Sequence, residues 1–208
     1  MNKYRIPASD ARAEYIEKKS RFIAQVFLVD SEQAARERLA AVRKEHYDAR
    51  HHCWCLRLHG GFQRCSDDGE PQGTAGQPML AVFEREEIEN VLCVVTRYFG
   101  GVLLGAGGLC RAYAKTAKDA LDAAGVAEMR PWTRMQLCCG YPLLERVRQE
   151  LGRSGCAVED TDYGQEITLR FVVPQAEQAP LCLRLQELSA GRLQPLALET
   201  VFRGVRIS

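Results

Sequence analysis

The chain has 208 residues, 46% of them hydrophobic and 26% charged, with 28 Lys and Arg against 27 Asp and Glu. That length suits one large domain or two small ones, and the composition excludes a disordered, collagen-like or coiled-coil chain. A near-zero net charge gives no global field toward nucleic acid, so any such surface must be a local patch. No apolar run approaches the roughly 18 residues of a membrane span, which predicts no membrane partner.

Cysteine usage and the N-terminal sequence both indicate a cytoplasmic protein. The nine cysteines are an odd number without framework spacing, which fits a reducing compartment. The N-terminal stretch MNKYRIPASDARAEY is charged throughout and lacks the apolar run of a secretory signal.

Strands and helices alternate through the first part of the chain. Asp30 offers a helix N-cap, Gly125 stands at a helix C-cap position, and Gly60–Gln77 is dense in Gly, Asp, Ser and Pro, which predicts loop. The expected strands are 22–29, 52–58 and 91–99, and the expected helices are 31–46, one from about 76, and 109–124.

The pattern restarts near Arg130-Pro131 as a second unit. Its order is strand, helix, strand, strand, helix, strand, at residues 135–141, 143–153, 156–163, 166–173, 176–188 and 192–202. This βαββαβ order is ferredoxin-like, with an antiparallel sheet and both helices on one face. We therefore predict an α+β protein with two domains, residues 1–130 and 131–208.

A glycine-rich segment, Arg97–Leu109 (RYFGGVLLGAGGL), lies between a buried strand and a helix. Such a loop can bring backbone N–H groups onto an anion, and Arg97 could hold a phosphate. Neither nucleotide-binding fingerprint is complete, because Cys110 takes the place of the last glycine of G-x-G-x-x-G and no Gly-Lys-Ser/Thr end is present. The glycines could instead serve close helix–sheet packing.

Basic side chains follow the glycines along the same expected helix. Arg111, Lys115 and Lys118 recur at i, i+4 and i+7, a stripe that would suit an RNA backbone. An ordinary solvated helix face gives the same pattern.

The sequence RHHCWC at 50–55 combines histidines and cysteines, but it predicts no metal site. Neighbours in a strand point to opposite faces, so His51 and His52 do not converge, and no C-x2-C pair is present. We expect one histidine and Trp54 to face the surface, with Cys53 and Cys55 in the core.

An acidic loop, SDDGEP at 66–71, allows two interpretations. Asp67, Asp68 and Glu70 could hold Mg²⁺ through oxygen, or one could act as a base beside a histidine. An Asp-Gly turn and a helix cap at Thr74 explain the same residues.

Together, four segments give the chain a close resemblance to the IMPACT/YigZ family. They are KKSRFIA at 18–24, DARHHCW at 48–54, SDDGEPQGTAGQPML at 66–80 and TRYFGGVLLGAGGLCRAY at 96–113, in family order. The βαββαβ unit is similar to the second domain of bacterial members, so the resemblance covers essentially the whole chain.

The resemblance implies a fold that the residue patterns alone do not reach. The first domain should be of the ribosomal-protein and elongation factor G domain IV type, with a left-handed βαβ crossover, which is rare. The second should resemble elongation factor G domain V. By this resemblance, the pair would mimic a translation-factor arm that meets ribosomal RNA. Eukaryotic relatives regulate a translation kinase with an additional N-terminal domain, and because this chain begins at the shared domain we expect that role not to apply.

We therefore predict a monomeric, translation-associated regulator without a cofactor, which binds RNA or the ribosome through the glycine-loop and arginine face. Arg97 and Arg111 would contact phosphate, Tyr98 or Trp54 would stack on a base, and the C-terminal sheet would add a second surface. The predicted binding set is Arg21, Trp54, Arg97, Tyr98, Gly100, Gly101, Gly105, Gly107, Gly108, Arg111 and Lys115.

Two other functions stay open. One is a Mg²⁺-dependent enzyme acting on a phosphorylated or nucleotide substrate through a polar pocket. That pocket would consist of His51, His52, Asp67, Asp68 and Glu70. The other is a protein-binding module that uses the same surface.

Overall fold

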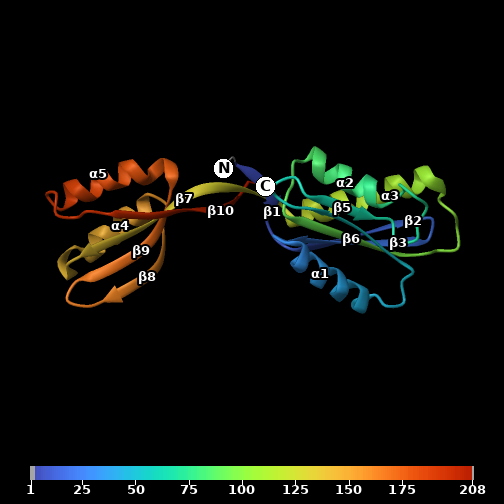
Figure 1. Ribbon diagram of the computed structural model, residues 1–208, viewed down its shortest axis with the longest axis horizontal. Helices are drawn as coiled ribbons and strands as arrows, with labels where there is room; N and C mark the ends of the chain where they lie inside the picture. The colour runs from blue at the N-terminus through green and yellow to red at the C-terminus, as the bar shows by residue number, and fades with distance from the viewer. Residues whose placement is uncertain (1–2, 208) are drawn as a thin grey trace. The chain divides into compact units, whose positions relative to one another are not determined.

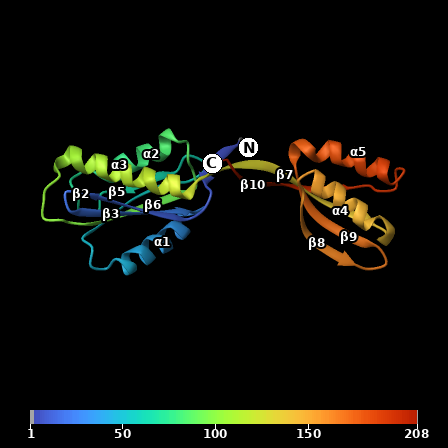
Figure 2. The same ribbon diagram turned by 180° about the vertical axis from the view of Figure 1, so that it is seen from behind.

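The computed structural model describes residues 3–207, so the predicted domain ends at 1 and 208 lie outside the described residues. The chain divides into two compact units (Figures 1 and 2). The first comprises Met1–Met129 together with Gly204–Ser208, and the second is Arg130–Arg203. The sequence pattern placed one division near residue 130, and the structure adds a return of the chain to the first unit at Gly204.

A five-stranded antiparallel sheet forms the first unit, in the order β2-β3-β6-β4-β5. Helix α1 covers one face of this sheet, and α2 and α3 cover the other (Figure 1). The strands are β2 (Ala11–Glu17), β3 (Ser20–Leu28), β4 (His51–Arg57), β5 (Gln63–Ser66) and β6 (Val91–Tyr98); the helices are α1 (Glu32–Glu45), α2 (Gly76–Arg85) and α3 (Gly105–Ala124).

Strand alternation on β6 builds a separate core on each face of the sheet. Cys93 and Val95 point to the α2–α3 side, where they pack with Tyr113. Leu92 and Val94 point to the α1 side, where they pack with Val42. Because β6 is central and covered on both faces, it has the continuous apolar sequence VLCVV.

The second unit is ferredoxin-like, as the element order predicted. Its strand order is β10-β7-β9-β8, and one face of the sheet packs on α4 and α5. Strand β7 begins in the first unit, where it pairs with β1. The remaining elements are β1 (Tyr4–Pro7), β7 (Val126–Cys139), η1 (Tyr141–Leu143), α4 (Leu144–Arg153), β8 (Ala157–Tyr163), β9 (Ile167–Pro174), η2 (Gln175–Glu177), α5 (Gln178–Leu188) and β10 (Leu196–Arg206).

The observed α+β class agrees with the sequence-based expectation, but several details differ. The sequence analysis did not predict strands β1, β2 and β5. Two of these, β2 and β5, are the edge strands of the first sheet. Ser31, and not Asp30, caps α1, because its Oγ accepts the backbone N–H of Ala34 at 3.3 Å. Helix α3 begins at Gly105, inside the stretch expected to be loop, and Gly125 caps it as predicted.

Candidate functional site

Arg97 and Glu70 form a buried ion pair on the α3 side of the first sheet. Arg97 Nη1 donates to Glu70 Oε1 at 2.6 Å, and the two side chains are 7% and 4% exposed. Tyr113 of α3 donates to the same carboxylate oxygen at 2.9 Å. Arg97 Nη2 also donates to Ser20 Oγ at 3.3 Å. The predicted direct contact between Arg97 and a phosphate does not fit this arrangement, since its guanidinium is already enclosed by protein.

Aromatic rings flank the Arg97 guanidinium. Its Cζ lies 5.4 Å from the Phe22 ring centroid and 5.5 Å from that of Phe99, distances at which cation–π attraction acts. Phe22 is fully buried, whereas Phe99 is 50% exposed. The ion pair therefore supports an aromatic ring that remains accessible from outside.

Cys53 and Tyr113 are protonated groups within this network. Cys53 Sγ lies 2.9 Å from the Asp67 carbonyl oxygen and 3.3 Å from Tyr113 Oη. Burial raises the pKa of the Cys53 thiol to about 12 and also raises the pKa of the Tyr113 hydroxyl. Since the thiolate is the reactive form of cysteine, Cys53 contributes packing here and is not an activated nucleophile.

Asp67 organises the loop that leads into α2. Its carboxylate accepts backbone N–H groups from Gly73 at 2.8 Å, Ala75 at 3.0 Å and Gly76 at 2.8 Å. Burial alone would raise the pKa of Asp67, but the three N–H donors together lower it. The carboxylate thus caps the beginning of α2 from eight or nine residues away.

Asp68 has different partners from Asp67. Its carboxylate accepts the backbone N–H of His52 at 2.7 Å and an Arg43 N–H at 3.0 Å. With Glu70 paired to Arg97, each carboxylate of the acidic loop serves a different element. Among residues 3–207, no group of three His, Cys, Asp or Glu side chains is placed to hold a metal ion.

The two adjacent histidines point to opposite faces of β4, as strand alternation predicts. His51 Nδ1 is 2.9 Å from the Asp68 carbonyl oxygen, and His52 Nε2 is 3.1 Å from the His46 carbonyl oxygen. Burial lowers the pKa of His52, which favours its neutral form. Both rings therefore satisfy backbone groups of neighbouring loops.

The predicted binding set divides between the two faces of the sheet. Tyr98 is on the α1 side, where its Oη donates to Asp48 at 3.0 Å. Arg21 lies opposite Tyr98 in register and forms a two-pronged pair with Glu14 at 2.7 and 2.8 Å. Trp54 also packs with the α1-side core. These three residues thus do not share a surface with Arg111 and Lys115.

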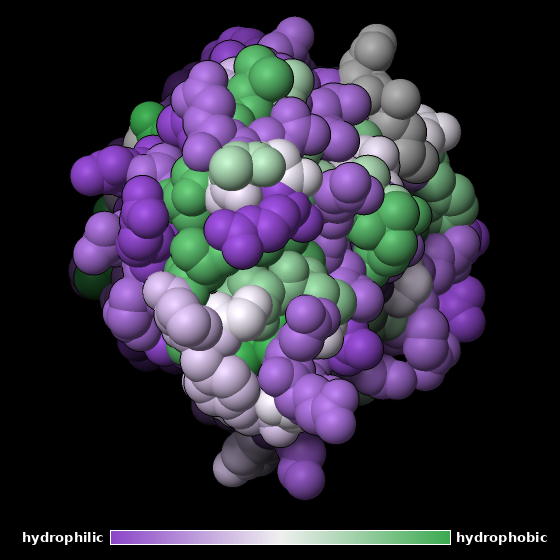
Figure 3. Space-filling model, turned by 90° about the vertical axis from the view of Figure 1, so that its left-hand side faces the viewer, coloured by the Kyte–Doolittle hydropathy of each residue, from purple (hydrophilic) through white to green (hydrophobic). Residues whose placement is uncertain are grey.

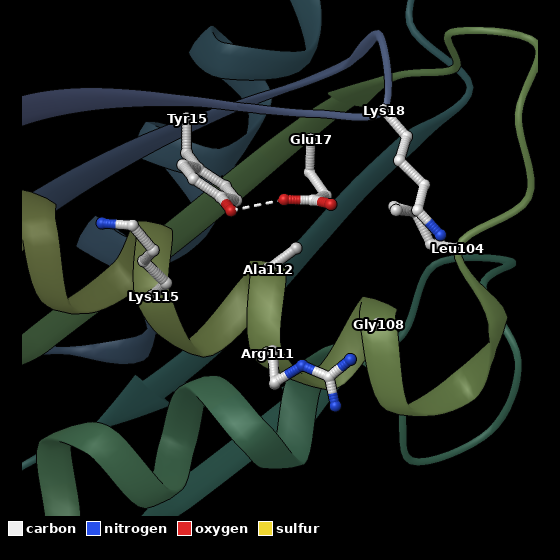
Figure 4. A pocket seen from close by; sticks show the side chains of 8 residues that line it. All are labelled: Tyr15, Glu17, Lys18, Leu104, Gly108, Arg111, Ala112 and Lys115. Carbon is white, nitrogen blue, oxygen red and sulfur yellow. Dashed lines mark hydrogen bonds between the residues drawn. The ribbon is translucent and has the colours of Figure 1, made fainter.

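A groove of about 420 Å³ lies between α3 and the turn that joins β2 to β3 (Figure 4). We call it the basic groove. Its walls carry three cationic side chains: Lys18 from the turn, and Arg111 and Lys115 from α3. The complete lining is Tyr15, Glu17, Lys18, Leu104, Gly108, Arg111, Ala112 and Lys115.

The cations of the basic groove differ in how they are paired. Lys115 Nζ is 2.7 Å from Asp119 and 5.0 Å from the Tyr15 ring centroid. Lys18 and Arg111 have no ion-pair partner among the residues that the structure describes. Sequence reasoning selected Arg111 and Lys115 but missed Lys18, which the hairpin places opposite them. The adjacent pair Lys18-Lys19 was the available signal.

The glycine loop, residues 99–104, lies against the same hairpin. A Cβ at Gly100 would stand 2.0 Å from the carbonyl carbon of Lys19, so only glycine permits this approach. Beyond it, Gly101 adopts a φ of 84°. Leu103 is 83% exposed and Val102 41%. The loop therefore presents apolar side chains to solvent beside the basic groove.

Helix α3 begins directly after this loop. Its N-cap residue is Leu104, whose side chain makes no capping hydrogen bond. Gly107 and Gly108 lie in its first turn, and Gly105 begins it with a φ of 69°. The first N–H groups of a helix carry a partial positive charge and prefer an anion. Leu104 and Gly108, at this end of α3, also line the basic groove.

The sheet of the second unit is less suited to an RNA backbone. Two of its arginines are paired with carboxylates, Arg134 with Glu159 and Glu199 and Arg170 with Asp160, and Arg203 lies over the Trp132 ring. Figure 3 shows patches of hydrophobic surface scattered among hydrophilic side chains on the end of the molecule that faces left in Figure 1. A second RNA contact on this sheet stays a prediction.

The fold and these features define a two-unit α+β protein with an IMPACT-type first domain. The model of the Impact N-terminal domain matches residues 18–121, and that of a domain of unknown function (DUF1949) matches residues 137–192. The chain belongs to the IMPACT family. In the part that the structure describes, no helix is long and apolar enough to cross a membrane.

Bacterial relatives match over nearly the whole chain. It is 38% identical to IMPACT family member YigZ of Escherichia coli, covering 96% of this chain and 100% of that protein. It is 35% identical to IMPACT family member YvyE of Bacillus subtilis, covering 86% and 83%. Human protein IMPACT is 31% identical over 48% of this chain and 31% of its own length. A crystal structure titled as that of a hypothetical protein superposes with a TM-score of 0.61 at 38% identity, covering 96% and 98%.

Proposed function

We propose that this protein is a translation-associated regulator that binds RNA or the ribosome through the basic groove and the adjoining glycine loop. Membership of the IMPACT family supports a translation-associated role in general. The observation that carries the specific proposal is the pair of cations, Lys18 and Arg111, on opposite walls of one groove. Neither has a carboxylate partner within residues 3–207.

Phosphate is the ligand group that best fits this groove. Lys18 offers a point charge from the hairpin, and Arg111 offers a planar fork from α3. The N-terminal turn of α3 adds backbone N–H donors at the same end of the helix. Because the net charge of the chain is only +1, attraction to RNA would depend on this local patch.

Phe99 is the aromatic residue best placed to receive an unpaired base beside the groove. Its ring rests over the Arg97 guanidinium and is half-exposed. Base–aromatic stacking tolerates any sequence and suits a protein that recognises RNA by its backbone. In this proposal Phe99 replaces Tyr98 and Trp54, which are on the other face of the sheet, and Arg97 acts as its support.

Co-sedimentation with purified ribosomes and with ribosomal RNA, at low and moderate salt, tests the proposal. The native chain should pellet at low salt and progressively less as salt rises, because phosphate binding releases counterions. The Lys18→Ala/Arg111→Ala double variant should lose most of this binding. The matched control is Lys44→Ala/Arg50→Ala, which removes the same charge from two exposed residues outside the groove. Equal binding by both double variants would contradict the proposal.

The exposed tip of the glycine loop favours a second candidate, a protein-binding module. Leu103 and Val102 form an apolar surface that RNA phosphates would not use. Pelleting that resists salt and is lost in Leu103→Ser, but not in Lys18→Ala/Arg111→Ala, would favour a protein contact instead.

A further inference from the structure

A second pocket lies on the face of the first sheet that α1 covers, opposite the face that carries the basic groove. Its volume is about 260 Å³. Its apolar walls come from α1, from β4 and from β6: Ala35, Leu39, Trp54, Leu56 and Leu92. No residue of this pocket lines the basic groove.

Three charged side chains stand at the rim of this α1 pocket. Glu32 Oε2 lies 3.0 Å from Arg36 Nη2 and 3.4 Å from Arg64 Nη1. Both arginines therefore share a single carboxylate oxygen. They are 69% and 59% exposed, and ion pairs this exposed contribute little to stability.

Arg36 and Arg64 have guanidinium N–H groups that Glu32 does not use and that could bind a further anion. Each guanidinium carries five N–H groups in a fixed fork, which matches a carboxylate with two parallel hydrogen bonds. Two positive charges face one negative charge, so the rim keeps a net charge of +1 by this count. An incoming carboxylate can join Glu32 or displace it from either arginine at small cost.

The interior of the α1 pocket has the opposite chemistry. Trp54 and Leu39 are only partly buried there, which leaves apolar surface uncovered. The volume is several times the roughly 30 Å³ that a water molecule takes up, and it lies just below the roughly 300 Å³ at which ligand pockets begin. Aliphatic and aromatic walls offer water few hydrogen bonds, so an apolar group of a small ligand gains by entering.

We propose that the α1 pocket binds a small ligand that joins one carboxylate to one apolar group. The apolar group lies against Trp54, Leu39 and Leu92. The carboxylate lies at the rim, where it accepts hydrogen bonds from Arg36 and Arg64. Glu32 now pairs with both arginines. This site does not depend on RNA binding at the basic groove, because it uses other residues on the other face of the sheet.

Trp54 provides the readout. The chain has two tryptophans, Trp54 and Trp132, so Trp132→Phe leaves Trp54 as the single indole. In this background, phenylpropanoate is titrated while Trp54 fluorescence is recorded, with phenylpropanamide as a neutral probe of almost the same shape. A saturable change with phenylpropanoate, at least tenfold weaker with the amide, is expected, since one hydrogen bond to a charged group contributes about that factor.

Variants at the rim give responses of opposite sign. Glu32→Gln frees both arginines from a competing charge and should tighten phenylpropanoate binding several-fold without affecting the amide. Arg36→Ala/Arg64→Ala should weaken phenylpropanoate about tenfold or more. The groove variant Lys18→Ala/Arg111→Ala should bind the probe as the native chain does. Circular dichroism checks that α1 is intact in each variant.

Three results would overturn this inference. They are the absence of a saturable Trp54 response, equal affinity for the acid and the amide, and an unchanged or weaker affinity in Glu32→Gln. Each leaves the co-sedimentation test of the basic groove unaffected, so the two proposals fail separately.

Discussion

Arg97 and Glu70 are 2.6 Å apart, and both side chains are more than nine-tenths buried. Removing one member of such a pair leaves an uncompensated charge inside the protein, at a cost of about 3–5 kcal/mol. We expect Arg97→Ala to destabilise the first unit by that amount. Urea unfolding followed by Trp54 fluorescence in the Trp132→Phe background measures it.

The double variant Arg97→Met/Glu70→Gln is the control for charge. Because it leaves no buried charge behind, it should be more stable than Arg97→Ala. If the double variant is the less stable of the two, shape and not charge dominates at this position.

Asp67 should make stability depend on pH in the acid range. Its pKa in the folded state is lowered from 3.8, so the carboxylate contributes stability that is fully present above the ordinary value. That contribution is lost as pH falls through the lowered pKa. Asp67→Asn should cost about 1–2 kcal/mol at neutral pH, as loss of a cap does.

The difference between the native chain and Asp67→Asn should shrink as pH falls below about 4, because protonated Asp67 accepts weaker hydrogen bonds. Urea midpoints measured at several pH values would show this convergence. If the stabilities of the native chain and of Asp67→Asn instead differed by the same amount at every pH, protonation of Asp67 would not be the cause of the pH dependence.

Substitution by alanine should destabilise the protein at Gly100 but not at Gly107. At Gly100 the new Cβ would overlap the Lys19 carbonyl, so Gly100→Ala should destabilise the first unit by about 1–3 kcal/mol. At Gly107, in the first turn of α3, the new Cβ would meet only the flexible end of Arg111 at 3.5 Å.

Gly107→Ala should therefore be neutral or stabilise by up to about 1 kcal/mol, because alanine favours a helix over glycine. Thermal unfolding of both variants provides the comparison. A similar loss of thermal stability in both variants would contradict this distinction between the loop glycine and the helix glycine.

The number of phosphates that the basic groove engages should be visible in the salt dependence of RNA binding. Each lost phosphate contact reduces the slope of log K against log salt by about one. Lys18→Ala/Arg111→Ala should therefore lower the slope by about two. Titrations at four salt concentrations measure it, and an unchanged slope would place the contacts elsewhere.

Residues 204–207 should stabilise the first unit despite their distance along the chain. The backbone N–H of Ile207 donates to the Val126 carbonyl at 2.8 Å, and Gly204 lies close to Ile6 and Met129. Deleting residues 204–208 should lower the urea midpoint reported by Trp54. An unchanged midpoint would mean that β1 alone is enough to hold this end of β7.

Hydrophobic pattern predicted the central elements of the fold well. Strand β6 and helix α3 have apolar residues at the expected periods because both are covered by protein. The β2–β3 hairpin was missed because its turn consists of Lys18 and Lys19, with φ of 45° and 67°. Glycine or asparagine normally marks such left-handed positions, so residue type gave no signal.

The sequence predicted only part of the arrangement at the candidate site, because that arrangement depends on contacts between distant segments. The sequence placed Arg97 and Arg111 in the predicted binding set, but it does not say which face of the sheet a side chain reaches. That depends on strand register, and here register separates Tyr98 and Arg21 from the groove. It also directs Arg97 inward to Glu70, a partner 27 positions away that no local pattern indicates.

The return of the chain to the first unit has a consequence for biosynthesis. Arg130–Arg203 is an insertion between two segments that pair with each other, β7 at Val126 and the stretch from Gly204. Domains generally fold as they emerge during synthesis, the N-terminal one first. Here the first unit to emerge cannot form the hydrogen bond from Ile207 to the Val126 carbonyl until the whole second unit has been translated.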